Sequence, residues 1–204
     1  MHIELWTPDS GLRTPDYKLT GSLAMNDRVK RELREWVESL VIAVILALVI
    51  RTFVVQAFKI PTGSMRMTLL EGDRILVNKF LYKFQEPRRG DIIVFKYPGD
   101  MKKDFIKRLI ATEGEEIEIK DGDIYIDGER VEDPFIVRKI NYYNKSPYGE
   151  AGKKITVPED SYFVMGDNSA SSRDSRYWGF VPEKNLIGKA FFLYWPLNRI
   201  RKVE

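Results

Sequence analysis

The fold of this chain is decided by a β-rich segment near its middle, Phe105-Ile106-Lys107-Arg108-Leu109-Ile110-Ala111. Apolar residues dominate the segment, and it contains no Gly or Pro, as is typical of a strand inside a sheet. Successive side chains of a strand point to opposite faces, so Lys107 shares one face with the odd-numbered apolar residues, and Arg108 lies on the other. The pattern therefore predicts that Lys107 lies among apolar side chains.

Similar β-rich runs, bounded by Gly, Pro and Asp, lie on both sides of this segment and are predicted to be strands. They are residues 75–80, 91–96, 116–120, 162–165 and 186–195. Residues 123–131 carry an Asp-Gly pair between two strand-like arms, which predicts a hairpin. No long amphipathic helical pattern follows residue 58, so the predicted fold class is mainly β: one mostly antiparallel β domain over residues 59–204, with a smaller β-rich insertion at about 120–160.

A long apolar run precedes the β domain. Residues 40–58 would form a helix roughly 28 Å long, which is enough to cross a bilayer, with Arg51 placed toward one interface. The run has no polar face, which disfavours a buried soluble helix or a helix lying in the interface. We therefore predict a tail over residues 1–36 and a single transmembrane anchor over residues 37–58.

The charges around the run indicate its direction. Four basic residues crowd its N-terminal flank, whereas only Lys59 and Arg66 follow closely, so the positive-inside rule places the tail in the cytoplasm and the β domain outside. The four are Arg28, Lys30, Arg31 and Arg34. A cleaved signal peptide is the main alternative, because Val55-Gln56-Ala57 resembles a small-residue cleavage pattern. The long leader before the apolar run favours an anchor that stays attached.

Composition excludes several classes of function. The 204 residues include no Cys and only one His, His2, so disulfides, thiol nucleophiles and Cys- or His-based metal sites are not expected. No cofactor or metal is predicted. The net charge of +3 comes from basic residues spread among nearly as many acidic ones, which argues against nucleic-acid binding.

A candidate nucleophile follows the apolar run at Ser64, within Pro61-Thr62-Gly63-Ser64-Met65. The single histidine lies on the other side of the run, so a base for Ser64 would be a carboxylate or a lysine, and Lys107 is the lysine in an apolar setting. Only about 1 in 2,500 ordinary lysines is neutral at pH 7, but burial lowers the pKa and reduces that penalty. Taken alone, Ser64 also fits an ordinary turn residue, and Lys107 a lysine whose head reaches water.

Four motifs together resemble a known family, bacterial type I signal peptidase. They are residues 61–65 with 68–73, Lys107-Arg108, Gly166-Asp167-Asn168, and Ser172-Arg173-Asp174-Ser175-Arg176-Tyr177-Trp178-Gly179. The resemblance implies a membrane-bound serine endopeptidase with a Ser-Lys dyad, in which Ser64 is the nucleophile and Lys107 the general base. It also implies that Thr62 and the Ser64 backbone N–H form the oxyanion hole, and that Ser172 orients the lysine. Three further roles are implied: Asp174 and Arg176 form a structural ion pair, and Met65 helps line the substrate cleft.

By the same resemblance, the partners are signal-peptide-bearing preproteins and the lipid bilayer, and the protein is a single-pass monomer of the bacterial cytoplasmic membrane. Substrates would carry small residues at the −1 and −3 positions before the cut. The sequence departs from the family pattern at Met67, Thr112-Glu113 and residues 169–171, none of which removes a catalytic group.

Other interpretations stay open. A different serine–lysine processing protease of related fold, such as one acting on pilins or in conjugation, would differ in substrate range. A self-cleaving DNA-binding repressor would carry a helix-turn-helix module where this chain has its apolar run. The Ser-x-x-Lys signature of penicillin-binding enzymes is absent, because Met67 is the third residue after Ser64. A membrane-tethered β adaptor without catalysis is the non-enzymatic alternative.

Overall fold

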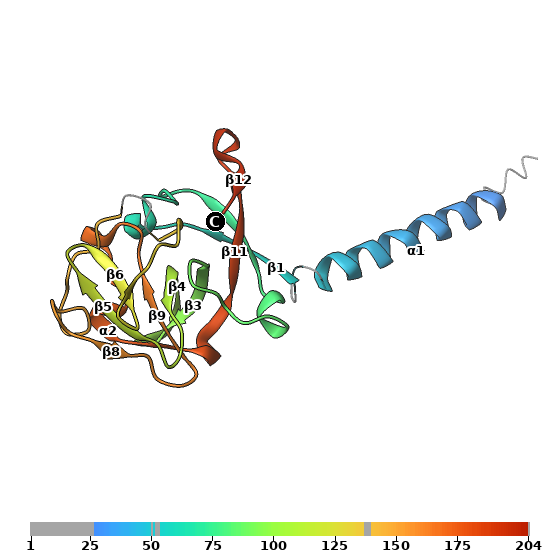
Figure 1. The fold of residues 1–204 in the computed structure, drawn as a ribbon. Helices are drawn as coiled ribbons and strands as arrows, with labels where there is room; N and C mark the ends of the chain where they lie inside the picture. The colour runs from blue at the N-terminus through green and yellow to red at the C-terminus, as the bar shows by residue number, and fades with distance from the viewer. Residues whose placement is uncertain (1–26, 50, 52–53, 137–139, 204) are drawn as a thin grey trace, which may run out of the picture. The chain divides into compact units, whose positions relative to one another are not determined.

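The computed structural model describes residues 27–49, 51, 54–136 and 140–203. Within these residues the chain forms one long helix, α1 (Asp27–Val49), and strands that pair into two sheets (Figure 1). The chain divides into two compact units, residues 1–44 and 45–204, each of which is described by itself. Most of the predicted tail, including His2, lies outside the described residues.

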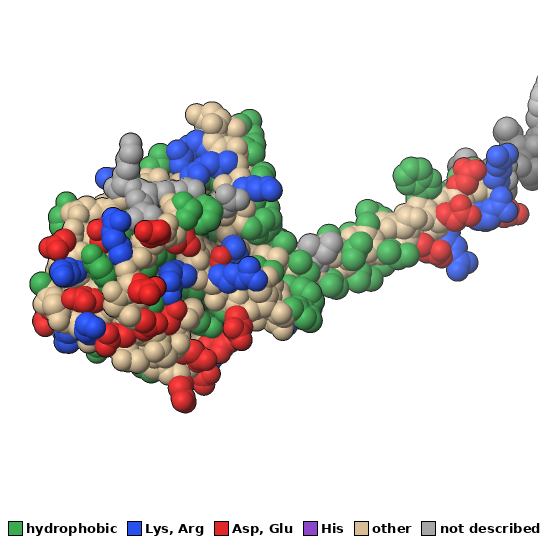
Figure 2. All heavy atoms as spheres, viewed as in Figure 1, with side chains coloured by type: hydrophobic (Ala, Val, Ile, Leu, Met, Phe, Trp, Pro, Cys, Tyr) green, Lys and Arg blue, Asp and Glu red, His purple; other side chains and the backbone are tan. Residues whose placement is uncertain are grey.

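Helix α1 begins within the segment predicted to be the tail, ten residues before the predicted anchor. Its first turns carry ion pairs at i,i+4 spacing, Arg28 with Glu32 and Arg34 with Glu38, at 3.3 and 2.8 Å. Such pairs support the first turns of the helix. The later turns are apolar, and none of the helix's residues is buried (Figure 2).

The other end of the predicted anchor also needs correction. Residues 55–58 belong to strand β1 (Val55–Lys59), which pairs antiparallel with β2 (Arg74–Asn78). Val55 lies opposite Asn78 and Lys59 opposite Arg74, so the sheet takes the backbone hydrogen bonds that a helix would have used. Among the helices in the described ranges, none is both long and apolar enough to cross a membrane.

The larger sheet has eight strands and is antiparallel throughout. Its order is β1-β2-β11-β3-β4-β9-β10, with β12 pairing with β11. The other bounds are β3 (Ile92–Tyr97), β4 (Asp100–Ala111), β9 (Ser161–Met165), β10 (Val181–Pro182), β11 (Leu186–Trp195) and β12 (Arg201–Lys202). Strand β4 thus lies inside the sheet, between β3 and β9, and the strands predicted at 75–80, 91–96, 105–111, 162–165 and 186–195 are confirmed to within a few residues.

The smaller sheet lies between β4 and β9 in the chain. Its strands are β5 (Glu116–Lys120), β6 (Asp123–Ile126), β7 (Glu129–Arg130) and β8 (Ile155–Thr156), in the order β7-β6-β5-β8. The predicted hairpin is confirmed, because β6 and β7 pair across Asp127 and Gly128, whose φ angles are 53° and 84°. Positive φ at both central residues is what a tight type I′ turn requires, and Asp-Gly tolerates it.

Three apolar clusters hold the β unit together. The first lies under the smaller sheet and includes Ile117, Ile126 and Phe163. The second involves β1, β2, β3 and β11 and includes Ile75 and Leu193. The third contains Phe95 and Leu109. The helical pieces after β1 are short: η2 (Gly63–Met65), η3 (Leu81–Lys83), η4 (Ser169–Ser171), α2 (Ser175–Trp178), η5 (Glu183–Asn185) and η6 (Leu197–Arg199). For the described residues, this confirms the prediction of no long helix after residue 58.

Candidate active site

Ser64 lies in η2, in the connection between β1 and β2. Backbone hydrogen bonds close the neck of this connection, from Ile60 N–H to Asp73 O and from Gly72 N–H to Ile60 O, at 2.9 and 2.8 Å. Met65 and Leu69 are fully buried in the core beneath the turn. The turn is therefore fixed from below, and the nucleophile candidate has a defined position.

Lys107 reaches the same place from β4. Its Nζ lies 2.7 Å from Ser64 Oγ and 2.9 Å from the carbonyl oxygen of Ile106, and its side chain is 4% exposed. The ring centroid of Phe105 is 5.6 Å from the same Nζ. Ser64 and Lys107, 43 positions apart in the sequence, are thus brought into hydrogen-bond contact.

The surroundings of Lys107 favour its neutral form. Burial lowers the pKa of its ammonium group to about 8, although the carboxylates of Asp174 and Asp167 act in the opposite direction. Among the described residues no carboxylate lies within ion-pair distance of Nζ, so desolvation is not offset by a salt bridge. With a pKa near 8, about one molecule in ten has a neutral Lys107 at pH 7. That amine can accept a proton from Ser64.

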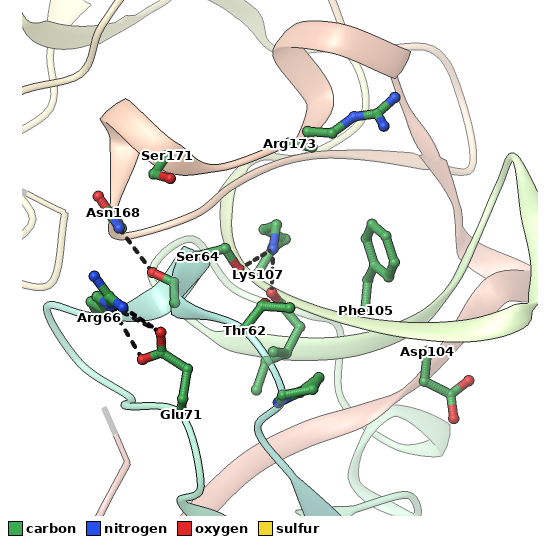
Figure 3. A pocket seen from close by; sticks show the side chains of 13 residues that line it. Thr62, Ser64, Arg66, Glu71, Asp104, Phe105, Lys107, Asn168, Ser171 and Arg173 are labelled. Atoms are coloured by element: carbon green, nitrogen blue, oxygen red, sulfur yellow. Dashed lines mark hydrogen bonds and ion pairs between the residues drawn. The ribbon is translucent and has the colours of Figure 1, made fainter.

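A cavity of about 480 Å³ opens beside the two residues (Figure 3). Its walls come from three elements: the serine turn, strand β4 and the loop after β9. The lining residues are Pro61, Thr62, Gly63, Ser64, Arg66, Glu71, Asp104, Phe105, Ile106, Lys107, Asn168, Ser171 and Arg173. A smaller apolar recess adjoins it, with walls that include Phe58, Ile75 and Val94.

The loop after β9 holds the serine turn from the opposite side. Asn168 donates its side-chain amide to Gly63 O at 2.9 Å, and its backbone N–H donates to Ser64 O at 3.0 Å. Gly166 approaches so closely that a Cβ at this position would lie 2.5 Å from Ser64 O. In the sequence, Asn168 is recognisable only as part of a motif. Its amide contact links positions 105 apart, which a local pattern does not reveal.

Arg108, the neighbour of Lys107, is buried on the other face of β4 and is fully paired. Its guanidinium donates to both carboxylate oxygens of Asp167, at 2.8 and 2.7 Å, and to Gly90 O at 2.6 Å. Thr68 donates its hydroxyl to Asp167 as well, at 2.5 Å. This network ties the loop after β9 to strand β4 and to the chain that follows Ser64.

A second buried pair lies next to the first. Arg176 and Asp174 form a bidentate contact at 2.8 and 2.7 Å, and both side chains are fully buried. Asp174 also accepts a hydrogen bond from Gly166 N–H at 3.0 Å, and Arg176 donates to Ser169 Oγ at 2.8 Å. The pair thus fixes the loop that carries Gly166 and Asn168.

The structure places the remaining predicted residues as follows. Thr62 lies on the cavity wall with an exposed side chain. Ser172 is buried, and within the described part of the chain its hydroxyl has no hydrogen-bond partner, so its predicted contact with Lys107 stays a prediction. The assignment of Met65 to the cleft is corrected, because its side chain is 0% exposed and packs into the core under the turn.

This arrangement is suited to serine acyl transfer. It combines a hydroxyl, an adjacent amine that is neutral in part of the molecules, a nearby exposed hydroxyl and an open cavity beside all three. Among the described residues no group of three His, Cys, Asp or Glu side chains is placed to hold a metal ion.

Comparison with known proteins agrees with this chemistry. Residues 33–195 match the model of the family described as signal peptidase, peptidase S26. The chain is 40% identical over 173 residues to the probable signal peptidase I-2 of Synechocystis sp., covering 81% of this chain and 76% of that protein. It is 38% identical to the signal peptidase I of Leptolyngbya laminosa, covering 94% of each. A crystal structure of a signal peptidase I from Enterococcus faecalis V583 aligns with a TM-score of 0.41 and 36% identity, covering 52% of this chain and 97% of that one.

Proposed function

This chain belongs to the signal peptidase family, peptidase S26, and from that premise we propose that Ser64 and Lys107 act as a catalytic dyad that removes signal peptides from preproteins at a membrane. The enzyme is a serine endopeptidase related to signal peptidase I. The observation that carries the dyad is the 2.7 Å contact between Ser64 Oγ and a buried Lys107 Nζ whose pKa is lowered.

In the proposed reaction, neutral Lys107 accepts the Ser64 proton while Ser64 Oγ attacks the carbonyl carbon of the scissile peptide bond. The developing oxyanion accepts hydrogen bonds from the Ser64 backbone N–H and the Thr62 hydroxyl. The ammonium of Lys107 then returns its proton to the leaving amine, and the signal peptide stays bound as an ester on Ser64. Water, deprotonated by Lys107, hydrolyses that ester and restores Ser64.

The supporting residues hold this geometry without touching the substrate. Asn168 and Gly166 fix the serine turn, and the ion pair of Asp174 with Arg176 holds their loop. We propose that Ser172, which is buried beside Gly166, orients the Lys107 side chain. The preprotein residues before the cut would lie in the cavity as an extended peptide along residues 104–106. The adjoining recess is narrow and apolar, which suits the small residues expected before the cut.

The dyad is tested by cleavage of a preprotein with the purified full-length protein in detergent. Ser64→Ala and Lys107→Ala should each abolish cleavage. The unfolding midpoint of Ser64→Ala should equal that of the wild type. Lys102→Ala, on the exposed part of the same strand, serves as the matched control and should cut normally. Normal cutting by Lys107→Ala would overturn the dyad, and an inactive wild type on several preproteins would favour the adaptor alternative.

The oxyanion role of Thr62 has its own test. Thr62→Val keeps the shape of the side chain but removes the donor, and should lower turnover by ~10²–10³. Thr62→Ser, which keeps the hydroxyl, should retain most of the activity. Full activity in Thr62→Val would reject the role.

We further propose that the apolar part of α1 anchors the enzyme in the bacterial cytoplasmic membrane, with the N-terminus in the cytoplasm and the β unit outside. In the described residues the apolar side chains of α1 are uncovered; Leu40 and Ile42, for example, are 64% and 66% exposed. Protease added outside intact cells should digest the β unit and leave an N-terminal tag protected. Release of the full chain by alkaline carbonate would contradict the anchor.

A further inference from the structure

A basic pocket lies beyond the apolar recess of the catalytic cavity, and its volume is about 550 Å³. Its lining residues are Gln56, Lys79, Lys83, Lys96, Asp104, Leu186 and Ile187. Three lysines thus meet one carboxylate, and Asp104 is already paired with Lys96 at 2.6 Å. Among the described residues Lys83, which is exposed, has no ion-pair partner. The pocket therefore presents positive charge to a side chain that enters it.

The basic pocket adjoins the catalytic cavity along strands β4 and β1. Asp104 lines the cavity, the apolar recess and the basic pocket. Figure 3 shows Asp104 on the opposite side of the cavity from Arg66 and Glu71. On β1 the recess is lined by Phe58 and the basic pocket by Gln56, two residues earlier in the same strand. Both strands thus lead from the recess toward the lysines.

An extended peptide can follow this path. Strand β3 pairs with one edge of β4, and β9 pairs with the other edge at residues 108–111, so within the described residues no strand covers that second edge at 104–106. Asp104 lies three residues before Lys107, which is roughly 10 Å along an extended strand. A peptide on this edge has the same rise. With its −1 carbonyl at Ser64, its residue −4 is level with Asp104, and the next residues reach the lysines.

We propose that the basic pocket is a substrate subsite that binds an acidic side chain at about position −5 of the preprotein, with Lys83 pairing with its carboxylate. This inference rests on the proposed function and extends its specificity beyond the small residues next to the cut. Lys96 is held by Asp104, whereas Lys83 is the cation available to a ligand. Ion pairs at exposed sites contribute modestly, so the subsite sets a preference among preproteins and not a requirement.

Competition between two preproteins tests the preference. The full-length enzyme in a non-ionic detergent receives equal amounts of preproteins that differ only in Asp or Asn at position −5, and the products give the ratio of their kcat/KM values. Because Asp and Asn have nearly the same shape, the ratio reports charge. We expect the Asp preprotein to be favoured about fivefold at low salt, the upper range for exposed ion pairs, and the ratio to approach one at high salt.

Enzyme variants locate the preference in the pocket. Lys83→Gln should lower the ratio to about twofold, because Lys79 and Lys96 remain, and Lys83→Glu should invert it. Lys120→Gln is the matched control, since Lys120 is exposed at the end of β5 in the smaller sheet, and it should keep the wild-type ratio. Equal cutting of the Asp and Asn preproteins at each of positions −4, −5 and −6, or a preference that Lys83→Gln leaves unchanged, would overturn the proposal.

Binding to the Ser64→Ala variant separates this result from failure of the proposed function. Fluorescent signal peptides with Asp or Asn at position −5 are titrated into the variant, with and without Lys83→Gln. Binding that favours Asp through Lys83, without cleavage by the wild type, would keep the subsite and reject the catalytic proposal. Cleavage that depends on Ser64 and Lys107 but ignores the charge at −5 would keep the dyad and reject the subsite.

Discussion

Lys107 and Arg108 are neighbours on β4 and both are buried, but only Arg108 has a carboxylate partner for its charge. Arg108 makes a bidentate ion pair with Asp167, whereas the contacts of Lys107 Nζ are the hydroxyl of Ser64 and the carbonyl of Ile106. A buried cation without a carboxylate partner loses hydration with no ionic compensation, so its pKa falls. The Arg108 face is built for structure, and the Lys107 face for proton transfer.

The alternation of a strand makes this division possible within two residues. One face of β4 turns toward the serine turn and the cavity, and the other toward Thr68, Gly90 and Asp167. Since both faces share one backbone, the ion-pair network that fixes Arg108 also fixes the position from which Lys107 approaches Ser64. Stability and reactivity are thus separated in this strand by side-chain direction rather than by distance.

The largest expected effect comes from removing the paired cation. Arg108→Met leaves Asp167 buried without its ionic partner, which should destabilise the fold by about 3–5 kcal/mol. Chemical unfolding of the full chain in detergent measures the change, with Lys102→Met as the exposed control on the same strand. A loss below 1 kcal/mol would show that the Arg108 face is not the structural one.

Replacing Lys107 by Met should have the opposite effect on stability to replacing Arg108 by Met. The folded-state pKa of Lys107, about 8, lies below its ordinary value of 10.5, so the charge opposes folding below pH 8. Lys107→Met should therefore raise stability at pH 7 by up to about 3 kcal/mol while abolishing cleavage.

This stability gain has a defined pH dependence. The unfolded chain binds more protons than the folded one between pH 8 and 10.5, so wild-type stability should rise through that window relative to the variant. Unfolding curves of both proteins at pH 7, 9 and 10.5 measure the gap. If Lys107→Met were less stable than wild type at pH 7, the charge of Lys107 would not oppose folding, and the contrast with Arg108 would be wrong.

A third change disturbs the serine turn without removing either cation. An added Cβ at Gly166 would lie 2.5 Å from the Ser64 carbonyl oxygen, which is backbone and cannot simply rotate away. Gly166→Ala should shift Ser64 relative to Lys107 and lower kcat/KM about 100-fold. Steady-state cleavage measures it. Activity within threefold of wild type would mean that the close approach does not position the nucleophile.

The smallest effect is expected at the rim of the cavity. Arg66 and Glu71 form an ion pair at 2.6 Å, but their side chains are 61% and 38% exposed. Solvent screens such pairs, so Glu71→Gln should leave the unfolding midpoint unchanged and kcat/KM within twofold. A tenfold loss of kcat/KM would show that this exposed ion pair supports the site as the buried groups do.

Much of the β fold was predictable because its strands carry alternating or continuous apolar residues and its hairpin carries Asp127-Gly128. The ends of α1 were not. Ion pairs such as Arg34 with Glu38 extend the helix into a charged segment, and pairing with β2 draws residues 55–58 out of the apolar run into a strand. The first effect depends on side-chain spacing, and the second on a partner strand that local pattern does not reveal.

For the site, the lack of a nearby histidine and strand alternation made Ser64 and Lys107 candidates, and the resemblance to the signal peptidase family implied their roles. It gave no reason to connect Asn168 with Gly63, or Arg108 with Asp167, because these contacts join distant segments. It also misplaced Met65, since a residue next to a nucleophile can equally face the core.

The most direct test of the central claim is the pH dependence of kcat/KM for preprotein cleavage by the full-length enzyme. If the unpaired, buried Lys107 is the general base, activity should rise with pH and level off above an apparent pKa of about 8. An ascending limb centred near 10.5, or a profile that is flat between pH 6 and 10, would contradict it.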